Sequence, residues 1–309
     1  MMFMLLGCLS LYAADDDLNT KQITIKLEKA GTLPGRIGRI GSKYEITNLK
    51  IIGEINGTDL KMIREMAGSY YNYGKLSVLD LSEAKIVEGG DCYYDDYYTY
   101  NDVIGSHAFE NCYSLTSLTL PAGITEIGNE AFKRCWKLTS LTLPAGITSI
   151  GYGAFEDCWK LTSLTLPAGI TEIGADAFNG CSGLTSLTLP AGITSIGEFA
   201  FSYCSGLTSI YVYAEKVPRI GRYAFEGCAS RKCTLYVPKG TYDNYRLSEF
   251  GYFENIVEFD ATGIDKTTTS TDVEEVSRYS LNGQRLAVPV KGLNIVKYSD
   301  GTVRKVVVK

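Results

Sequence analysis

The feature that most limits what this chain can fold into is a segment that repeats every 23 residues. Its first copy begins at Cys112 and reads Cys-Tyr-Ser-Leu-Thr-Ser-Leu-Thr-Leu-Pro-Ala-Gly-Ile-Thr-Glu-Ile-Gly-Asn-Glu-Ala-Phe-Lys-Arg. The segment restarts at Cys135, Cys158, Cys181 and Cys204. One unit of this length cannot bury its own apolar side chains, so neighbouring units must stack. The constant spacing therefore predicts a solenoid of stacked coils.

The first part of each unit predicts a short β-strand. In the first copy Leu118 and Leu120 alternate with Ser117 and Thr119, which places the leucines inside and the hydroxyl groups outside. Pro121 follows and ends the strand, because proline has no N–H to give to a neighbouring strand. Stacked copies of this strand are expected to form a parallel sheet.

The second part of each unit closes the coil. Ile124 and Ile127 are expected to face inward in a second short extended piece. Ala131, Phe132 and Cys135 then follow at a spacing that suits one turn of α-helix or 3₁₀-helix on the far side of the coil. In the stack, each residue then lies on the equivalent residue of the neighbouring coil. The leucines, the phenylalanines and the cysteines therefore each form a column.

The pattern Leu-x-x-Leu-x-Leu-Pro, then Ile-x-x-Ile-Gly-x-x-Ala-Phe and a closing Cys, resembles the BspA-like leucine-rich repeats of bacterial surface proteins, also called the Treponema pallidum type. The resemblance covers residues 76–228. It implies a leucine-rich-repeat solenoid of short parallel strands with short helical or 3₁₀ turns on the far side. It also implies a role in cell-surface adhesion, with matrix proteins or other cells as partners.

The N-terminal residues predict export. Residues 1–14 form an apolar run that ends in small residues, as a signal peptide does. Leu5-Leu-Gly-Cys8 resembles a lipobox, so a lipid anchor at Cys8 is an open alternative. No later stretch is long and apolar enough to cross a membrane. We therefore expect the chain to associate with a membrane only through such an anchor or through surface sorting.

Residues 15–75 are predicted to close the N-terminal end of the solenoid, which otherwise exposes the core of its first coil to water. Alternating residues within 22–27 and 44–55 predict two strands. Thr58 is expected to cap a helix over residues 59–67.

The solenoid itself is predicted over residues 76–259, with an insertion at 83–102 and a C-terminal cap that includes a helix over 241–253. Residues 260–277 are rich in Thr, Ser and Asp and predict a linker. Residues 278–309 predict a small β module, with hairpin turns at Asn282-Gly and Asp300-Gly. This tail resembles the C-terminal sorting domains of Bacteroidetes-type exported proteins.

The cysteines predict a buried, reduced column. An exported chain with nine Cys would ordinarily form disulfides. Here six of them (Cys112, Cys135, Cys158, Cys181, Cys204 and Cys228) share one slot of the repeat and point the same way into the core. A column does not converge on a point, so it predicts no metal site. A local bridge between Cys228 and Cys233 stays open.

Composition and motifs argue against catalysis and against nucleic acid. The net charge of −5 is unsuited to a nucleic-acid surface. The one histidine, His107, occupies a slot that Glu130, Gly153 and Asp176 fill in other coils, which predicts a solvent-facing position. No cofactor motif is present. An enzyme that uses a carboxylate pair is the remote alternative.

Three groups of residues are candidates for ligand binding. The open face of the sheet carries Asp80, Thr119, Thr142 and Thr165, which equally describe a solvated β-face. The slot after Cys holds aromatic residues in three successive coils, and these either bind a ligand or shield the edge of the core. This ladder and its lysines are Tyr113, Trp136, Trp159, Lys137 and Lys160. The insertion supplies Tyr93, Tyr94, Asp95, Asp96, Tyr97, Tyr98 and Tyr100.

These observations predict a non-catalytic, exported recognition protein, monomeric, that binds a protein or glycan ligand. Specificity is expected where the chain departs from its own repeat, so the insertion and the aromatic ladder are predicted to form one site. A structural spacer without a specific ligand is the competing interpretation, since the plain repeat strands are nearly identical from coil to coil.

Overall fold

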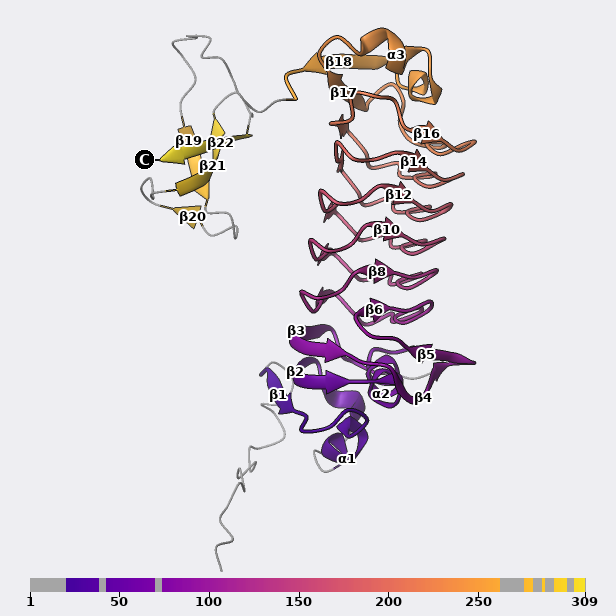
Figure 1. The fold of residues 1–309 in the computed structure, drawn as a ribbon, viewed down its shortest axis with the longest axis vertical. Coiled ribbons are helices and arrows are strands. Elements are labelled where there is room, and N and C mark those ends of the chain that lie inside the picture. The colour runs from indigo at the N-terminus through magenta and orange to yellow at the C-terminus, as the bar shows by residue number, and fades with distance from the viewer. Residues whose placement is uncertain are drawn as a thin grey trace, which may run out of the picture. The chain divides into compact units, whose positions relative to one another are not determined.

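The computed structural model describes residues 21–38, 43–69 and 74–261, together with four strands of the C-terminal tail (Figure 1). The chain divides into two compact units, residues 1–257 and 258–309. The predicted signal peptide and Cys8, most of the predicted linker and the hairpin turns of the tail lie outside the described residues. Among the described residues, none of the helices combines the length and apolarity needed to traverse a bilayer.

The larger unit is a leucine-rich-repeat solenoid whose coils stack in parallel (Figure 1). One sheet has the order β1-β2-β3-β7-β9-β11. Leu118, Leu141 and Leu164 face one another in its register, so one coil equals one sequence repeat. Its strands are β1 (Ile23–Lys26), β2 (Asn48–Ile55), β3 (Val78–Ile86), β7 (Ser117–Thr119), β9 (Ser140–Thr142) and β11 (Ser163–Thr165). The first strands of the later coils form a separate sheet, which the C-terminal cap extends. Its strands are β13 (Ser186–Leu189), β15 (Ser209–Val212), β17 (Thr234–Pro238) and β18 (Asn255–Phe259).

The second strand of each coil builds another parallel sheet, in the order β16-β14-β12-β10-β8-β6. A glycine follows each of these strands because the coils approach closely there. A Cβ on Gly174 would lie 2.6 Å from the carbonyl carbon of Gly151 in the preceding coil, which no side chain tolerates. The strands are β6 (Val103–Ile104), β8 (Glu126–Ile127), β10 (Ser149–Ile150), β12 (Glu172–Ile173), β14 (Ser195–Ile196) and β16 (Arg219–Ile220).

The far side of each coil consists of successive turns, and the expected helical turn does not form there. The N–H of Phe109 donates to the carbonyl of Ala131 in the next coil at 2.7 Å, whereas the N–H of Glu110 donates to His107 in its own coil at 3.1 Å. Two residues per coil adopt positive φ, as His107 and Asn111 do at 60°. A helix would direct every N–H along its own axis, and the stack instead uses alternate ones to join neighbouring coils.

The core is a set of single-residue columns along the stack. The rings of Phe109, Phe132, Phe155, Phe178, Phe201 and Phe225 stack in sequence, with centroids 5.0–5.6 Å apart. The neighbouring leucine and isoleucine columns are equally buried. Burial on this scale supplies the stabilisation that one coil lacks by itself.

The cysteine column is buried and its thiols are unpaired, as the repeat predicts. From Cys135 onward, each Sγ of the column donates to the carbonyl of the phenylalanine in the preceding coil, for example Cys135 to Phe109 at 3.1 Å. Cys228 and Cys233 are also unpaired, so the local bridge is not formed. Burial raises the pKa of Cys112 and of Cys228 to about 12, and that of Cys233 to about 11.

We expect native thiols to resist modification. A thiol reagent at neutral pH should label the half-buried Cys92 far faster than the seven buried cysteines, because the thiolate is the reactive form and burial disfavours it. Denaturation should expose most of the seven. Intact mass after labelling, native and denatured, measures both. Pairwise oxidation of column cysteines in the purified protein would contradict the column.

Stability should fall at alkaline pH. The folded pKa values of Cys112 and Cys228, about 12, lie above the ordinary 9.0, so the unfolded chain loses these protons first. The stabilisation is complete below pH 9.0 and is lost as pH rises toward about 12. Urea melts at about pH 8 and about pH 10.5 measure this loss. Cys158→Ala removes one titrating thiol and should make the loss smaller. An identical loss in this variant would exclude the thiols as its cause.

The N-terminal cap contains α1 (Leu33–Ile37), η1 (Lys43–Glu45) and α2 (Gly57–Met66). Helix α2 begins earlier than the predicted helix, and Thr58 is not its cap. Asn56 caps it instead, with its side chain accepting from the N–H of Thr58 while Asp59 accepts from the N–H of Asn56. The apolar side chains of α2 belong to the continuous core, so they cover the end of the solenoid.

The C-terminal cap contains α3 (Tyr242–Arg246) and η2 (Glu249–Tyr252) in place of the single expected helix. Ser248 separates them, since its hydroxyl donates to the carbonyl of Tyr245 and accepts from the N–H of Phe250. Phe250 and Phe253 pack against Phe225, each 5.3 Å between centroids, and end the phenylalanine column.

The smaller unit contains a four-stranded antiparallel sheet in the order β20-β19-β21-β22. Its strands are β19 (Glu275–Tyr279), β20 (Arg285–Leu286), β21 (Gly292–Tyr298) and β22 (Val303–Val308). The strands agree with the β module expected in this part of the chain. Its resemblance to sorting domains stays a prediction.

Candidate functional site

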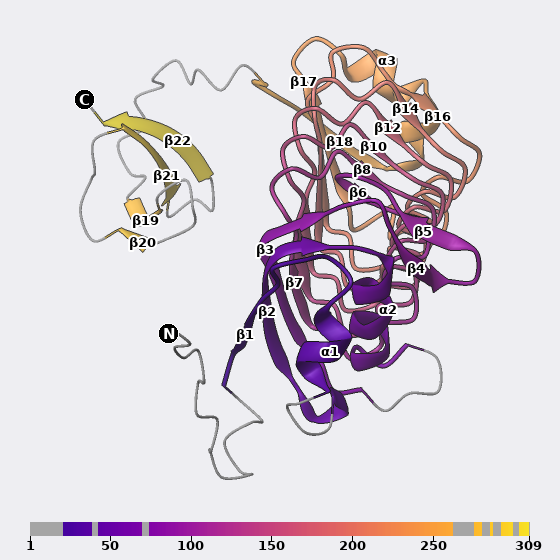
Figure 2. The same cartoon turned by 60° about the horizontal axis from the view of Figure 1, so that its bottom comes forward.

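The insertion is an ordered β-hairpin, formed by β4 (Gly89–Tyr94) and β5 (Tyr97–Thr99), that lies beside α2 (Figure 2). Thr58 attaches it to α2: its hydroxyl accepts from the N–H of Asp91 at 2.9 Å and donates to the Asp91 carboxylate at 3.0 Å. The hydroxyl of Thr99 donates to the carbonyl of Val87 at 2.8 Å. The hairpin is therefore held at both its strands.

Tyr93 is the residue of the insertion that cannot bind a ligand. Its side chain is buried, and its hydroxyl donates to the carbonyl of Ser106 at 2.7 Å. Burial raises its pKa to about 12. Tyr93 therefore anchors the hairpin to the first coil, which corrects its place among the candidate contact residues. Tyr93 and Tyr94 are neighbours on one strand, so only one of them can face inward, and the sequence did not show which.

His107 is largely covered, whereas its slot predicted a solvent-facing residue. Its side chain is 17% exposed. The ring of Tyr94 stacks on the imidazole at 4.8 Å, and the ring of Tyr97 meets it edge-on at 4.8 Å. The slot is half-covered in other coils as well, since the side chain of Glu130 is 20% exposed. At His107 the covering rings come from the insertion.

Charged groups surround the covered face of this histidine. Its Nδ1 lies 2.7 Å from Glu110 Oε2 and 3.4 Å from Glu130 Oε2. The buried Arg64 donates to the His107 carbonyl and places its guanidinium 4.8 Å from the centre of the Tyr94 ring. Arg64 thus connects helix α2, the hairpin and the first coil through one cation.

Lys133 extends the network to the following coil. Its Nζ lies 3.3 Å from Glu130 and 2.9 Å from Glu156. Burial lowers the pKa of Lys133, but the hydrogen bonds and charges of the two carboxylates outweigh burial and leave that pKa raised. The Lys133 ammonium is thus shared between carboxylates of two successive coils.

Among the described residues, His107, Glu110 and Glu130 form a group whose ligand atoms all lie within 4.8 Å of one another. One imidazole and two carboxylates suit a divalent transition metal. Each member already has a protein partner, with Glu110 also bonded to Asn111 and Glu130 to Lys133. The imidazole Nδ1 lies beside the carboxylates of Glu110 and Glu130, an arrangement that orients the ring.

The aromatic ladder is a continuous stack. The ring centroids of Tyr113 and Trp136 are 4.4 Å apart, and those of Trp136 and Trp159 are 5.1 Å apart at an interplanar angle of 10°. Trp136 is half-buried, with its indole N–H buried and without a partner. Trp159 is 49% exposed and ends the stack, so it is the ring a ligand can reach. Lys137 and Lys160 beside it are exposed.

The open sheet face has the register that the repeat predicts. Thr119, Thr142 and Thr165 lie in one exposed row. Asp80 continues this row, 3.3 Å from the ammonium of Lys50. Burial raises the pKa of Asp80, but its bonds to Ser82 and Lys50 outweigh that effect and leave it lowered.

The hairpin and the ladder occupy different ends of the turn segment of the first coil. Tyr94 and Tyr97 lie over His107 at its beginning, and Tyr113 lies at its end. Tyr97 is still 41% exposed, and Tyr98 and Tyr100 are 46% and 62% exposed. Asp95 and Asp96 form the exposed turn of the hairpin. That both parts bind one ligand stays a prediction.

Residues 102–232 match the family model described as a BspA type leucine-rich repeat region, in six copies. The matched segment is less than half of the chain and coincides with the regular coils. The regular coils of the solenoid are therefore similar to leucine-rich repeats of the BspA type. The N-terminal cap, the hairpin and the C-terminal tail lie outside the match.

No curated protein matches the chain. Several solved structures match parts of the chain. A leucine-rich repeat protein of T. pallidum is 27% identical over 53% of this chain and 72% of its own, with a TM-score of 0.39. A leucine-rich cell surface protein of Faecalibacterium prausnitzii is 24% identical over 70% and 51%, with a TM-score of 0.35. The pneumococcal vaccine antigen PcpA is 16% identical over 69% and 57%, with a TM-score of 0.43.

Proposed function

We propose that this chain is an exported, non-catalytic recognition protein of the cell surface, which binds a protein or glycan ligand through aromatic side chains at the N-terminal end of its solenoid. The exposed tyrosines of the hairpin carry the proposal. Tyr97, Tyr98 and Tyr100 present three large rings on one short hairpin. Tyrosine gives a large contact area at a low cost in conformational entropy, which is why interfaces are enriched in it.

The rigidity of the hairpin supports the proposal. Thr58 and Thr99 attach its backbone, and the buried Tyr93 anchors its inner face. A surface whose contact residues are already held loses less entropy when a ligand binds. A spacer has no use for such a structure, whereas the plain Ser/Thr rows of the middle coils are compatible with either function.

The ladder supports a second contact area. A stacked indole with a free face is suited to a sugar ring or to an apolar side chain, and Lys160 follows Trp159 in the sequence. The predicted signal peptide and the sorting-like tail support delivery to the surface. Adhesion to matrix proteins or to other cells is then the function we propose for the whole chain.

We expect Trp159→Ala to weaken ligand binding by ~1–3 kcal/mol, and the double change Tyr98→Ser with Tyr100→Ser to weaken it similarly. These residues are exposed, and none of them covers His107 or anchors the hairpin, so the fold should persist. A panel of labelled matrix proteins and glycans, probed with the mature chain, identifies the ligand. Titration of each variant against that ligand then measures the loss.

Ser186→Ala on a plain coil is the matched control and should leave affinity unchanged, with thermal melts to confirm folding of all variants. Affinity that survives both aromatic changes but falls with Ser186→Ala would move the site to the open sheet face. A mature chain that binds no member of the panel would favour the spacer.

A further inference from the structure

The sheet of second strands ends at β16 with an unpaired edge. On its inner side the N–H of Arg219 donates to Thr194 at 2.9 Å, and the N–H of Gly221 donates to Ile196 at 2.8 Å. Alternate residues of a parallel strand direct their N–H and C=O groups to opposite neighbours. The N–H and C=O of Ile220 therefore point toward the next position in the stack, where the described residues supply no strand.

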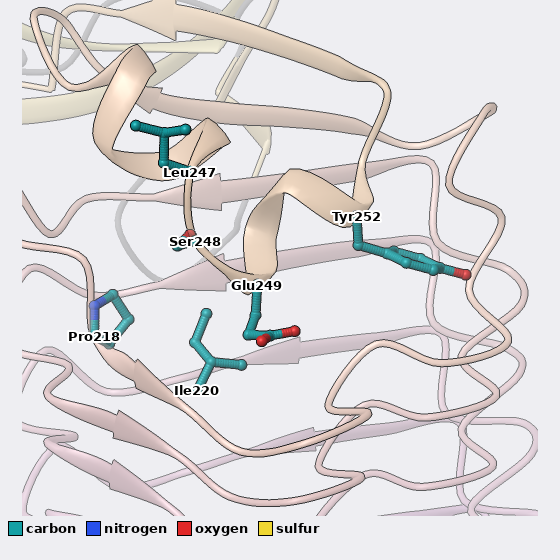
Figure 3. A pocket seen from close by; sticks show the side chains of 6 residues that line it. All are labelled: Pro218, Ile220, Leu247, Ser248, Glu249 and Tyr252. Atoms are coloured by element: carbon teal, nitrogen blue, oxygen red, sulfur yellow. The ribbon is translucent and has the colours of Figure 1, made fainter.

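The C-terminal cap continues only the sheet of first strands. Strand β17 pairs with β15, but the chain then enters α3 and η2 instead of forming another second strand. A groove of about 590 Å³ remains between β16 and these helices (Figure 3). Its lining consists of Pro218, Ile220, Leu247, Ser248, Glu249 and Tyr252.

Two apolar side chains of this groove lie open to solvent. Leu247 is 78% exposed and Tyr252 is 42% exposed. A single exposed leucine on a protein surface needs no explanation. Leu247, however, borders a groove that also contains the outward-pointing N–H and C=O groups of β16. A groove that has both apolar and polar side chains and lies beside a free strand edge suits an extended peptide that binds by strand addition.

We propose that this groove binds an extended peptide segment, which adds to β16 as the next parallel strand of the sheet. The repeat defines the chemistry of that segment. Ile196 faces Ile220 across the existing pair, so a β-branched apolar residue belongs beside Ile220, followed by glycine as in every coil. Arg219 occupies an exposed position of the row, so an acidic residue belongs opposite it. This site is separate from the aromatic residues of the proposed function.

The test is titration of a fluorescent, N-acetylated and C-amidated peptide, Ala-Gly-Ile-Thr-Glu-Ile-Gly, with the full chain. This is the sequence of residues 122–128, which forms such a strand within the stack. We expect saturable binding with a Kd of ~10–500 μM, which suits a short strand. N-methylation of the final glycine removes the donor to Ile220, and a Glu→Lys peptide places a cation beside Arg219. Each should weaken binding at least ~10-fold, about 1.4 kcal/mol.

Two changes in the protein test the same geometry. Leu247→Glu alters an exposed side chain and should weaken the peptide at least ~5-fold, about 1 kcal/mol. Ile220→Pro removes the outward N–H but leaves the bonds of Arg219 and Gly221 to the preceding coil, as an edge strand tolerates. The proposed function uses Trp159 to bind a different ligand, so Trp159→Ala should leave peptide binding unchanged.

Absence of saturable binding below about 1 mM would overturn the proposal. The proposal would also be overturned if neither N-methylation of the peptide nor Leu247→Glu changed the affinity, because that result would mean nonspecific binding. If Trp159→Ala weakened the peptide as strongly as Leu247→Glu, the peptide would be bound at the ladder and the groove would be excluded.

Discussion

Replacing Phe155 with alanine is expected to lower the free energy of unfolding by ~3–5 kcal/mol, the range for a large ring removed from a core. Phe155 is fully buried, with the rings of Phe132 and Phe178 at 5.0 and 5.1 Å on its two sides. These neighbours are poorly placed to fill the cavity, because Phe132 is stacked on Phe109 and Phe178 on Phe201 on their other sides. Urea denaturation followed by circular dichroism measures the loss.

Tyr152→Ala is the matched control, because Tyr152 lies on the same coil with its ring 46% exposed. It should cost no more than ~0.5 kcal/mol, as surface changes do. A stack of coils also unfolds coil by coil when one interface is weakened, so the Phe155→Ala melt should broaden as well as shift. Equal costs for the two variants would mean that the phenylalanine column does not support the fold.

Deleting residues 136–158 should leave a folded protein, whereas deleting residues 136–146 should not. The first deletion removes one full coil and joins Cys135 to Trp159, whose neighbours in the stack are equivalent to those of Trp136. The hydroxyls of Thr139 and Thr162 each donate to the threonine one coil earlier, at 3.0 and 3.2 Å, and such bonds can form again in the shortened stack. The second deletion places strand residues opposite turn residues and destroys the register.

Circular dichroism and thermal melts of both deletions decide this prediction. The full-coil deletion should retain a cooperative melt with a modestly lower midpoint, since one interface between coils is lost. The shorter deletion should give an expanded chain without a cooperative melt. Comparable damage from both would show that the coils are not interchangeable, which would contradict the one-coil register of the sheet.

The comparison of the hairpin with the coils shows where prediction from the sequence stopped. Tyr94 and Tyr97 cover His107 through contacts between residues about ten positions apart in a segment that occurs once. A repeat predicts contacts because each position has copies above and below it, and a unique insertion has no such copies. The groove beside β16 was missed for the same reason, because it depends on how α3 and η2 leave the stack.

The sequence by itself determined the architecture of the solenoid. A period of one coil, with apolar residues at constant positions, admits one stacking register, so the buried columns, the exposed threonine row and the stacked aromatic ladder all follow from it. Only the tertiary structure decided that Tyr93 is buried while Tyr100 is exposed, that His107 meets Glu110 and Glu130, and that the turns carry no helix. Those outcomes depend on which face of a strand packs against the first coil and on which backbone N–H groups bond to a neighbouring coil. Local residue patterns do not determine either of these.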